Sequence, residues 1–317
     1  MNRHFKKYYF YVIARCLSLL GFYDKSLPYY SKTIQIRTFF FDVQKRFRLA
    51  YEKSSKRCDL EIHGGVGDFL QHLPFMIKHP KENYVVVTHF PKAKEFFDTL
   101  HISVKKYHFY SEREEHHKIK SYFRKKSKSY PAPREVFFNR FPFHVNKKNL
   151  HQRKELITIG LHMTPSAMTS NALNLSFKQK LIQTLLKFQV AIILFGTKKE
   201  LYDLRHIKNN KIFFASDENI INNLSLVKHC DVLIGADSVF KTMSSMSRIP
   251  TILLYEDVKS HFRDRVFINP YVKNKIIYPY TYPLGSMEGL NLKLAIDFIL
   301  DILTRELKLI STPKRTS

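Results

Sequence analysis

Residues 58–70 read Cys-Asp-Leu-Glu-Ile-His-Gly-Gly-Val-Gly-Asp-Phe-Leu, a short apolar strand that runs into a glycine turn. Apolar residues recur at helical spacing after the turn, which predicts a helix. Further strands are predicted at 84–88 and 104–110, with a helix at 93–100 between them. Alternating strands and helices are typical of a parallel sheet with crossover helices.

The second half of the chain repeats this rhythm. Its strands are predicted at 156–161, 190–195, 211–215, 232–235 and 251–255, and its helices at 177–188, 198–208, 220–229, 240–248 and 290–307. The strands are continuous apolar runs, as expected when both faces of a parallel sheet are covered. We therefore predict an α/β protein with two Rossmann-like domains that face each other across a cleft. The predicted parts are a basic, aromatic, helical extension (1–56), a first domain (57–150), a second domain (151–287), and a final helix and tail (288–317).

The charge of the chain predicts an anionic partner. Its 317 residues include 53 Lys and Arg against 27 Asp and Glu, a formal net charge of +26. Nucleic acid, an anionic membrane surface and a phosphorylated substrate all fit this excess, and charge alone does not choose among them. The three cysteines are widely scattered, which excludes a disulfide framework and a cysteine-rich zinc site.

The N-terminal segment 8–22 is apolar but has Arg15 at its centre. It is too charged for a spanning helix and lacks the small-residue cleavage site of a signal peptide, so we expect the mature chain to start at Met1. Basic residues flank the segment, which leaves two interpretations open. It is either an amphipathic anchor on anionic lipid or a helix packed on the core.

The glycine turn at Gly64 and Gly65 exposes backbone amides at a helix N-terminus, where an anion can bind. A dinucleotide fingerprint needs a third glycine where Leu70 stands and an acid at the end of the next strand, and neither is present. The chain also has no Gly-Lys-Ser/Thr, which excludes a P-loop. The alternative is a tight turn in which Asp68 only caps the helix.

Three strand ends in the second half carry polar residues. The run from Asp231 to Ser238 ends in Asp237-Ser238 at a predicted helix start, and Lys241 follows one turn later. Ligands of open α/β sheets bind at this edge, and a helix N-terminus with a hydroxyl and a lysine suits a phosphate. The alternative is that Asp237 and Ser238 only cap the helix. The two other strand ends lead into 162–166 and 196–200, and each is ambiguous by itself.

Together, the four turns resemble in order and spacing the lipopolysaccharide heptosyltransferases and their relatives in glycosyltransferase family 9, which have the GT-B fold. Residues 65–74 match the family's Gly-x-Gly-Asp turn and the apolar helix with Leu-Pro that follows it. Residues 160–162 match its His-containing loop, and residues 195–196 match its Phe-Gly strand end. Residues 235–238 match its Gly-x-Asp-Ser turn, and residues 250–254 match its Pro-Thr strand. The resemblance covers about residues 57–257. The chain departs from the family at Val239 and Thr242, where the family commonly has Gly and His. It also departs at 169–173, where the family usually has a Lys-Trp element.

The resemblance implies an inverting transfer of a heptose or other hexose-type sugar from a nucleotide-sugar donor to a lipopolysaccharide core or surface-glycan acceptor. Asp68 is then the base that takes the proton of the acceptor hydroxyl. The residues expected to bind the donor are Gly64, Gly65, His162, Thr164, Phe195, Gly196, Thr197, Asp237, Ser238 and Lys241, with Glu200 as a further candidate. The chain contains no Asp-x-Asp, so we expect no metal and no cofactor.

Two other classes remain open, namely a catalytically inactive relative that binds carbohydrate and a basic nucleic-acid-binding protein. A GT-B transferase with another donor is a third possibility. Residues 104–154 carry 15 Lys and Arg against four acids. Within them Arg124, Lys125 and Lys126 either form a solvated face or bind a phosphorylated glycolipid or anionic membrane. On the second interpretation, the enzyme is cytoplasmic and peripheral on the inner face of the cytoplasmic membrane.

Overall fold

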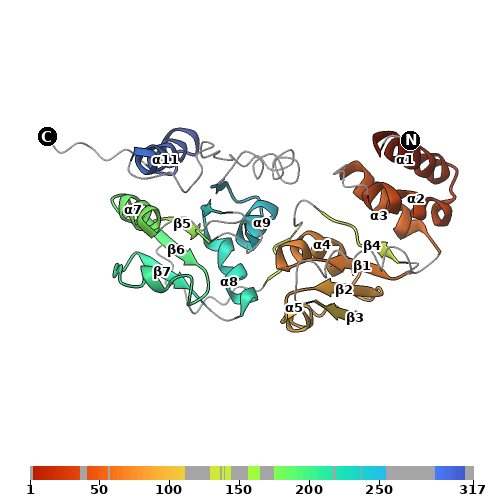
Figure 1. Cartoon of the computed structure of the whole chain (residues 1–317), viewed down its shortest axis with the longest axis horizontal. Coiled ribbons are helices and arrows are strands. Elements are labelled where there is room, and N and C mark those ends of the chain that lie inside the picture. Colours follow the sequence, from red (N-terminus) through yellow and green to blue (C-terminus); the bar gives the residue numbers. More distant parts are fainter. Residues whose placement is uncertain are drawn as a thin grey trace. The chain divides into compact units, whose positions relative to one another are not determined.

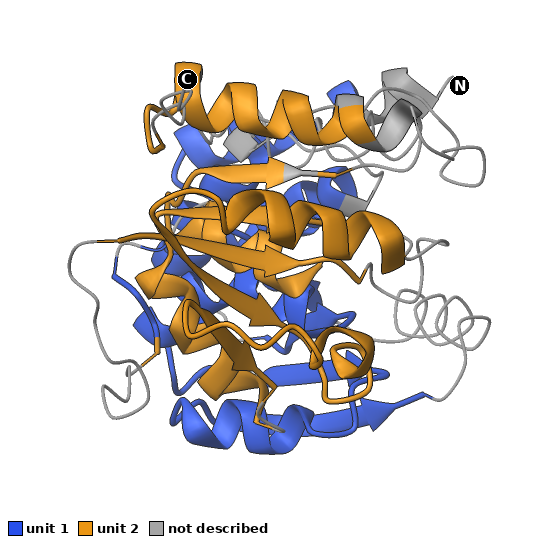
Figure 2. Cartoon of the chain, turned by 90° about the vertical axis from the view of Figure 1, so that its left-hand side faces the viewer, with its two compact units in different colours: residues 1–142 blue, residues 143–317 orange. Residues whose placement is uncertain are grey.

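The computed structural model describes residues 3–35, 41–55, 58–110, 129–135, 138, 140–143, 156–164, 175–216, 219–236, 238–254 and 290–310. The chain forms two compact units, Met1–Pro142 and Phe143–Ser317, which Figure 2 colours blue and orange. Each unit contains one parallel sheet (Figure 1). The boundary predicted at residue 150 lies outside the described residues.

Three helices begin unit 1: α1 (Arg3–Leu19), α2 (Tyr23–Gln35) and α3 (Phe41–Lys53). The last of them packs on the sheet, because the ring of Phe47 lies 6.1 Å from the ring of Tyr130 and the hydroxyl of Tyr51 donates to Glu82 at 2.8 Å. These helices and the sheet therefore form one unit. Within the described parts of the chain, no helix is both long enough and apolar enough to cross a membrane.

The sheet of unit 1 has the order β3-β2-β1-β4, and every pair is parallel. Its strands are β1 (Leu60–His63), β2 (Tyr84–Thr88), β3 (Val104–Phe109) and β4 (Tyr130–Pro131). Helix α4 (Val66–Lys78) follows β1 and α5 (Ala93–Thr99) follows β2, which confirms the predicted strand, turn and helix order. The short β4 was not predicted. It lies at the sheet edge, where a proline that cannot donate a hydrogen bond is tolerated.

The sheet of unit 2 is also parallel, in the order β7-β6-β5-β8-β9. Its strands are β5 (Ile157–His162), β6 (Val190–Phe195), β7 (Ile212–Ala215), β8 (Val232–Gly235) and β9 (Thr251–Leu253). This is the order of a doubly wound sheet, with a topological switch between β5 and β8. All five strands fall within two residues of their predicted positions.

Helices cover both faces of this sheet. They are α7 (Leu175–Leu185), α8 (Ile220–Leu226), α9 (Val239–Met246) and α11 (Leu290–Asp301), with shorter turns at η2 (Tyr202–Leu204), η3 (Val227–His229) and η5 (Ile302–Glu306). Helices α7 and α11 share a core with one face of the sheet, which includes Ile159 and Ile192. The other face meets α9, because the rings of Phe195 and Phe240 stack at 4.7 Å.

The helix predicted at 198–208 is wrong for most of its length. Only one helical turn, Tyr202–Leu204, forms there. Leu201 and Leu204 are buried, and their spacing of three residues imitates one face of a helix. Ile207 continues this spacing and packs against the same core, although the chain is not helical there, so the apolar pattern alone predicted a longer helix than forms.

Candidate functional site

The carboxyl edge of the sheet in unit 1 holds Asp68 in the first turn of α4. Gly64 has a φ of +120°, which favours glycine, and it turns the chain from β1 into the helix. Gly65 is the N-cap of α4, and its backbone N–H donates to Oδ2 of Asp68 at 3.3 Å. Asp68 therefore does cap the helix, as the alternative interpretation held, but from the third helical position.

The second carboxylate oxygen of Asp68 is held by Arg134. Nη2 of Arg134 lies 3.2 Å from Oδ1 of Asp68, while Nη1 donates to Oε1 of Gln71 at 3.0 Å. The side chain of Asp68 is 39% exposed, so solvent and ligands can reach the carboxylate. The sequence analysis missed Arg134, because it lies in the basic stretch that was considered only as a surface.

Helix α4 itself holds the segment that carries Arg134. The backbone N–H of Glu135 donates to the carbonyl of Gln71 at 2.7 Å, and Nδ1 of His72 donates to the carbonyl of Pro133 at 3.0 Å. His72 is fully buried, and burial holds its pKa well below the usual value, so its ring is neutral. The Gln-His pair of the 65–74 motif thus positions Arg134 beside Asp68.

Two more side chains lie at the ends of neighbouring strands. His89 follows β2 and Tyr110 follows β3, and Nδ1 of His89 lies 3.2 Å from the hydroxyl of Tyr110. Burial, with the negative charge of Asp68 adding to it, raises the pKa of Tyr110 to about 12, so the phenol stays protonated near neutral pH. A Cβ on Gly65 would lie 3.1 Å from the His89 ring. We call Asp68, His89, Tyr110 and Arg134 the Asp68 cluster.

In unit 2, two strand ends meet the first turn of α9. His162 ends β5 and Phe195 ends β6, and each ring lies 4.7 Å from the ring of Phe240. Phe195 is almost completely buried, so it shapes this edge from inside. The sequence analysis missed Phe240 as a site residue, since its only signal was that it is the apolar first residue of the helix predicted at 240–248. We call His162, Phe195, Phe240 and Ser238 the His162 cluster.

His162 is buried, with 6% of the residue exposed, and its Nδ1 has no hydrogen-bond partner among the residues that the structure describes. Burial lowers the pKa of His162 to about 4, against the opposing negative charge of Glu200, and the positive charge of Lys178 lowers it further. The imidazole is therefore neutral near pH 7 and has an unused ring nitrogen. A buried polar atom without a partner is rare and is often completed by a ligand.

The close approach of β5 and β8 depends on Gly235. A Cβ at this position would lie 2.0 Å from the carbonyl oxygen of His162. The same oxygen accepts a hydrogen bond from the backbone N–H of Ala236 at 2.9 Å. The absence of a side chain at Gly235 therefore brings His162 next to the start of α9.

Helix α9 begins at this edge with Ser238 as its N-cap. Oγ of Ser238 accepts from the backbone N–H of Lys241 at 3.4 Å, so the capping role considered for Ser238 is confirmed. The N-terminus of a helix carries partial positive charge and suits an anion. The side chain of Lys241 is buried at 3% exposure, so its charge lies within the protein. Asp237 lies outside the described residues.

The remaining donor candidates follow β5 and β6. Gly196 has a φ of +155° and lets the chain turn out of the sheet. The backbone N–H of Thr197 donates to Oε2 of Glu200 at 2.6 Å, and the N–H of Glu200 donates to Oγ1 of Thr197 at 3.2 Å. These two residues fix each other at the end of β6. Thr164, two residues after β5, is half-buried.

The acceptor residues predicted at Arg124, Lys125 and Lys126 lie outside the described residues. Over the described part of the chain, no three or more His, Cys, Asp or Glu side chains are grouped so that they could hold a metal ion.

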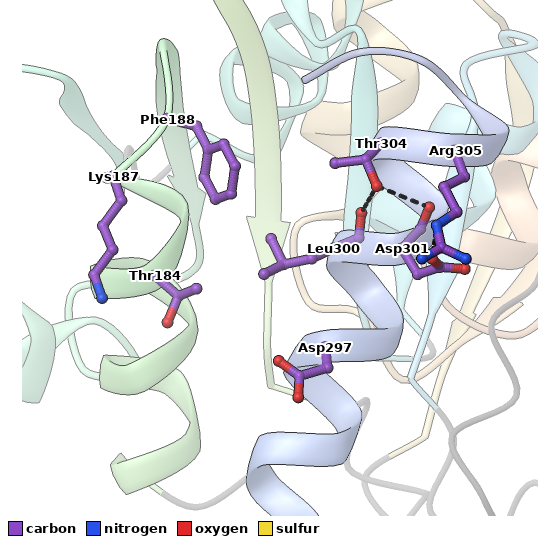
Figure 3. Close-up of a pocket in the computed structure, with 8 residues that line it drawn as sticks. All are labelled: Thr184, Lys187, Phe188, Asp297, Leu300, Asp301, Thr304 and Arg305. Atoms are coloured by element: carbon purple, nitrogen blue, oxygen red, sulfur yellow. Dashed lines mark hydrogen bonds and ion pairs between the residues drawn. The ribbon is translucent and has the colours of Figure 1, made fainter. Parts of the chain in front are cut away.

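A pocket of about 380 Å³ lies between α7 and α11 (Figure 3). Its lining residues are Thr184, Lys187, Phe188, Asp297, Leu300, Asp301, Thr304 and Arg305. Phe188 comes just before β6, so this pocket lies toward the amino ends of the strands. The described donor candidates of unit 2 lie at the opposite edge of the sheet, and none of them lines the pocket.

No family model matches the sequence, and no curated protein matches it. Several solved structures are similar in fold. Heptosyltransferase II of Escherichia coli (E. coli) is 12% identical, with a TM-score of 0.49 over 78% of this chain and 99% of that one. A family 9 glycosyltransferase from Veillonella parvula is 11% identical, with a TM-score of 0.48 over 79% of this chain and 96% of that one.

A UDP-GlcNAc 2-epimerase from Methanocaldococcus jannaschii is 13% identical, with a TM-score of 0.41 over 78% of this chain and 99% of that one. The first two names belong to the family that the sequence motifs resemble.

Proposed function

We propose that this chain is a glycosyltransferase that moves a sugar, with inversion, from a nucleotide-sugar donor to a hydroxyl of a lipopolysaccharide core or surface-glycan acceptor. We further propose that it works at the inner face of the cytoplasmic membrane. The observation that carries the proposal is the half-exposed carboxylate of Asp68, fixed by Gly65 and Arg134 at the carboxyl edge of a parallel sheet. Ligands of such sheets bind at this edge.

In the proposed reaction, Asp68 accepts the proton of the acceptor hydroxyl while that oxygen attacks the anomeric carbon. The bond from this carbon to the donor phosphate breaks on the opposite side of the sugar, so the configuration inverts. General-base help of this kind contributes about 10²–10⁴-fold to the rate. The two anchors of Asp68 fix its direction, which is what a base needs before the acceptor arrives.

The leaving diphosphate needs positive charge, which the N-terminus of α9 beside the His162 cluster can provide. Helix α9 presents its N-terminus at the carboxyl edge of unit 2, with the hydroxyl of Ser238 as its cap. Oriented backbone dipoles stabilise a developing negative charge without a metal ion. The unused Nδ1 of His162 lies beside this helix start and supports the assignment of this edge to the donor.

The first step of the test is a thermal-shift screen of the whole chain against ADP-, UDP-, GDP- and CMP-activated sugars. We expect one class to raise the midpoint of unfolding, since a ligand that binds only the folded state stabilises it. If none does, the assignment of a nucleotide-sugar donor is wrong.

The second step compares two aspartate variants. Asp68→Asn should keep the thermal shift and lose transfer by about 100-fold or more, because an amide cannot take the proton. Asp98→Asn is the matched control, since Asp98 is an exposed aspartate near the end of α5, away from the carboxyl edge. Unchanged turnover in Asp68→Asn would refute the base assignment. Donor binding without transfer in the unmodified chain would instead indicate an inactive relative that binds carbohydrate.

A further inference from the structure

Helix α1 exposes a continuous apolar face, although its opposite side is already packed. Val12 is 55% exposed, Leu19 is 75% exposed, and Leu20, just after the helix, is 69% exposed. With them we define the α1 face, which consists of Tyr8, Tyr9, Val12, Cys16, Leu19 and Leu20. Residues 8, 12, 16 and 19 repeat at the spacing of one side of a helix. Phe22 is 49% exposed and follows directly after this face.

The other side of α1 is covered by α2. Ala14 is fully buried, and the ring of Phe10 lies 6.3 Å from the ring of Tyr29. Nζ of Lys32 lies 5.2 Å from the centre of the Phe10 ring, so this contact also includes a cation–π interaction. The exposed apolar face is therefore additional to the packing of the helix. This packing agrees with one of the two interpretations left open from the sequence, a helix packed on the core.

A helix packed on one side of a soluble unit normally presents polar residues to water. A contiguous exposed apolar patch instead marks a surface that contacts a partner or a membrane. Tyrosine and phenylalanine at such a face suit the boundary between lipid headgroups and acyl chains, because their rings are apolar and the phenol is polar.

The charge of α1 selects the occupant of this face. The helix contains four basic residues, Arg3, Lys6, Lys7 and Arg15, and no Asp or Glu. Nζ of Lys25 lies 5.0 Å from the centre of the Phe22 ring, which adds a cation just beyond the C-terminal end of α1. Anionic lipid attracts such a surface, whereas a second copy of a chain with a net charge of +26 brings like charges together.

We propose that the α1 face docks on an anionic lipid bilayer, with the helix lying along the membrane surface. The apolar side chains enter the boundary between headgroups and acyl chains, and the basic residues contact the phosphates. This inference deepens the proposed function by naming the surface that would hold the chain at the membrane, and its link to a glycolipid acceptor in the same bilayer rests on that function. The docking itself needs neither donor nor transfer.

The test is flotation of the whole chain with lipid vesicles. One set is pure phosphatidylcholine, and the other contains about 30% phosphatidylglycerol as the anionic lipid. We expect binding to the anionic vesicles, with affinity that falls as salt is raised. The double variant Val12→Asp and Leu19→Asp should bind about tenfold more weakly or worse, because two apolar contacts become charged. Both positions are exposed, so circular dichroism and the unfolding midpoint should stay as in the unmodified chain.

The control is Tyr202→Asp, since Tyr202 is a 74% exposed aromatic residue in unit 2, outside the α1 face. It should bind vesicles like the unmodified chain. The inference is overturned if the unmodified chain does not bind anionic vesicles. It is overturned as well if the double variant binds these vesicles as tightly as the unmodified chain. It is also overturned if the unmodified chain binds no vesicles and light scattering gives it a larger mass than the double variant, because the face then joins two copies of the chain.

The same samples separate this inference from the proposed function. Asp68→Asn should float with the vesicles like the unmodified chain, and the double variant should keep its thermal shift with the nucleotide sugar. A chain that binds vesicles but no nucleotide sugar would refute the transferase and leave the docking face in place.

Discussion

The unpartnered ring nitrogen of His162 allows stability and ligand binding to be separated in one substitution. We predict that His162→Phe stabilises unit 2 and weakens binding of the nucleotide sugar. The new ring would occupy the same place against Phe240, 4.7 Å away, without a buried polar atom. A residue kept only for packing would not give these two opposite effects.

The magnitude follows from two contributions. A buried polar atom without a hydrogen bond costs about 1–3 kcal/mol, and the variant recovers this at neutral pH. The second contribution appears in acid, because burial lowers the pKa of His162 from 6.5 to about 4. Between these values, the unfolded chain binds a proton that the folded chain does not, so stability falls as the pH falls. By pH 5, this loss is about 2 kcal/mol for the unmodified chain and is absent from the variant.

The assay is urea unfolding followed by circular dichroism from pH 5 to 8, with hydrogen exchange of β5 and β8 peptides to report on unit 2 alone. The difference between variant and unmodified chain cancels the other histidines, including buried His72. His162→Leu is measured alongside, because the larger phenylalanine ring could crowd the site and hide the gain.

If both variants are no more stable than the unmodified chain and the difference does not grow in acid, then Nδ1 is paired in the folded protein and the reasoning is wrong. If both are more stable and bind the nucleotide sugar as before, then the nitrogen is unpartnered but is not a ligand group.

Two glycine substitutions give further predictions. Gly235→Ala should lower the free energy of unfolding by about 2–4 kcal/mol, because its Cβ would lie 2.0 Å from a backbone oxygen that cannot move without parting β8 from β5. Urea unfolding measures this, and a change below about 0.5 kcal/mol would contradict it. Gly64→Ala should cost about 1–2 kcal/mol for its positive φ and displace the Asp68 carboxylate, whose Oδ2 would lie 2.1 Å from the new Cβ. Loss of transfer with donor binding kept is expected, and normal turnover would show that the position of Asp68 does not matter.

Much of the fold could be predicted from local pattern. The strands of unit 2 are uninterrupted apolar runs, and their parallel pairing leaves few alternatives once helices separate them. The failure at 198–208 was also local in origin. Leu201, Leu204 and Ile207 recur every three residues and all pack against the core, so their spacing imitates a helix over a segment in which only one helical turn forms. The edge strand β4 has only two residues and includes a proline, so it left no periodic signal.

The candidate site was only half predictable, because chain order does not report on contacts between distant segments. Asp68 was found on the glycine turn after the first strand, and His162 was found at the end of a strand in the second half. Arg134 is 66 residues from Asp68 along the chain and reaches it only because Gln71 and His72 hold its segment. Its sole signal was a proline-rich extended stretch inside a basic region.

The two functions considered for Asp68, helix cap and catalytic base, are compatible in this geometry. Its Oδ2 accepts from Gly65 and its Oδ1 from Arg134, so each oxygen has one anchor. An ionised carboxylate has about four acceptor positions, which leaves room for an acceptor hydroxyl without breaking either anchor. Asparagine keeps an oxygen for one anchor but loses the basic carboxylate. Asp68→Asn therefore tests the base with less disturbance to the helix start, whereas alanine would remove cap and base together.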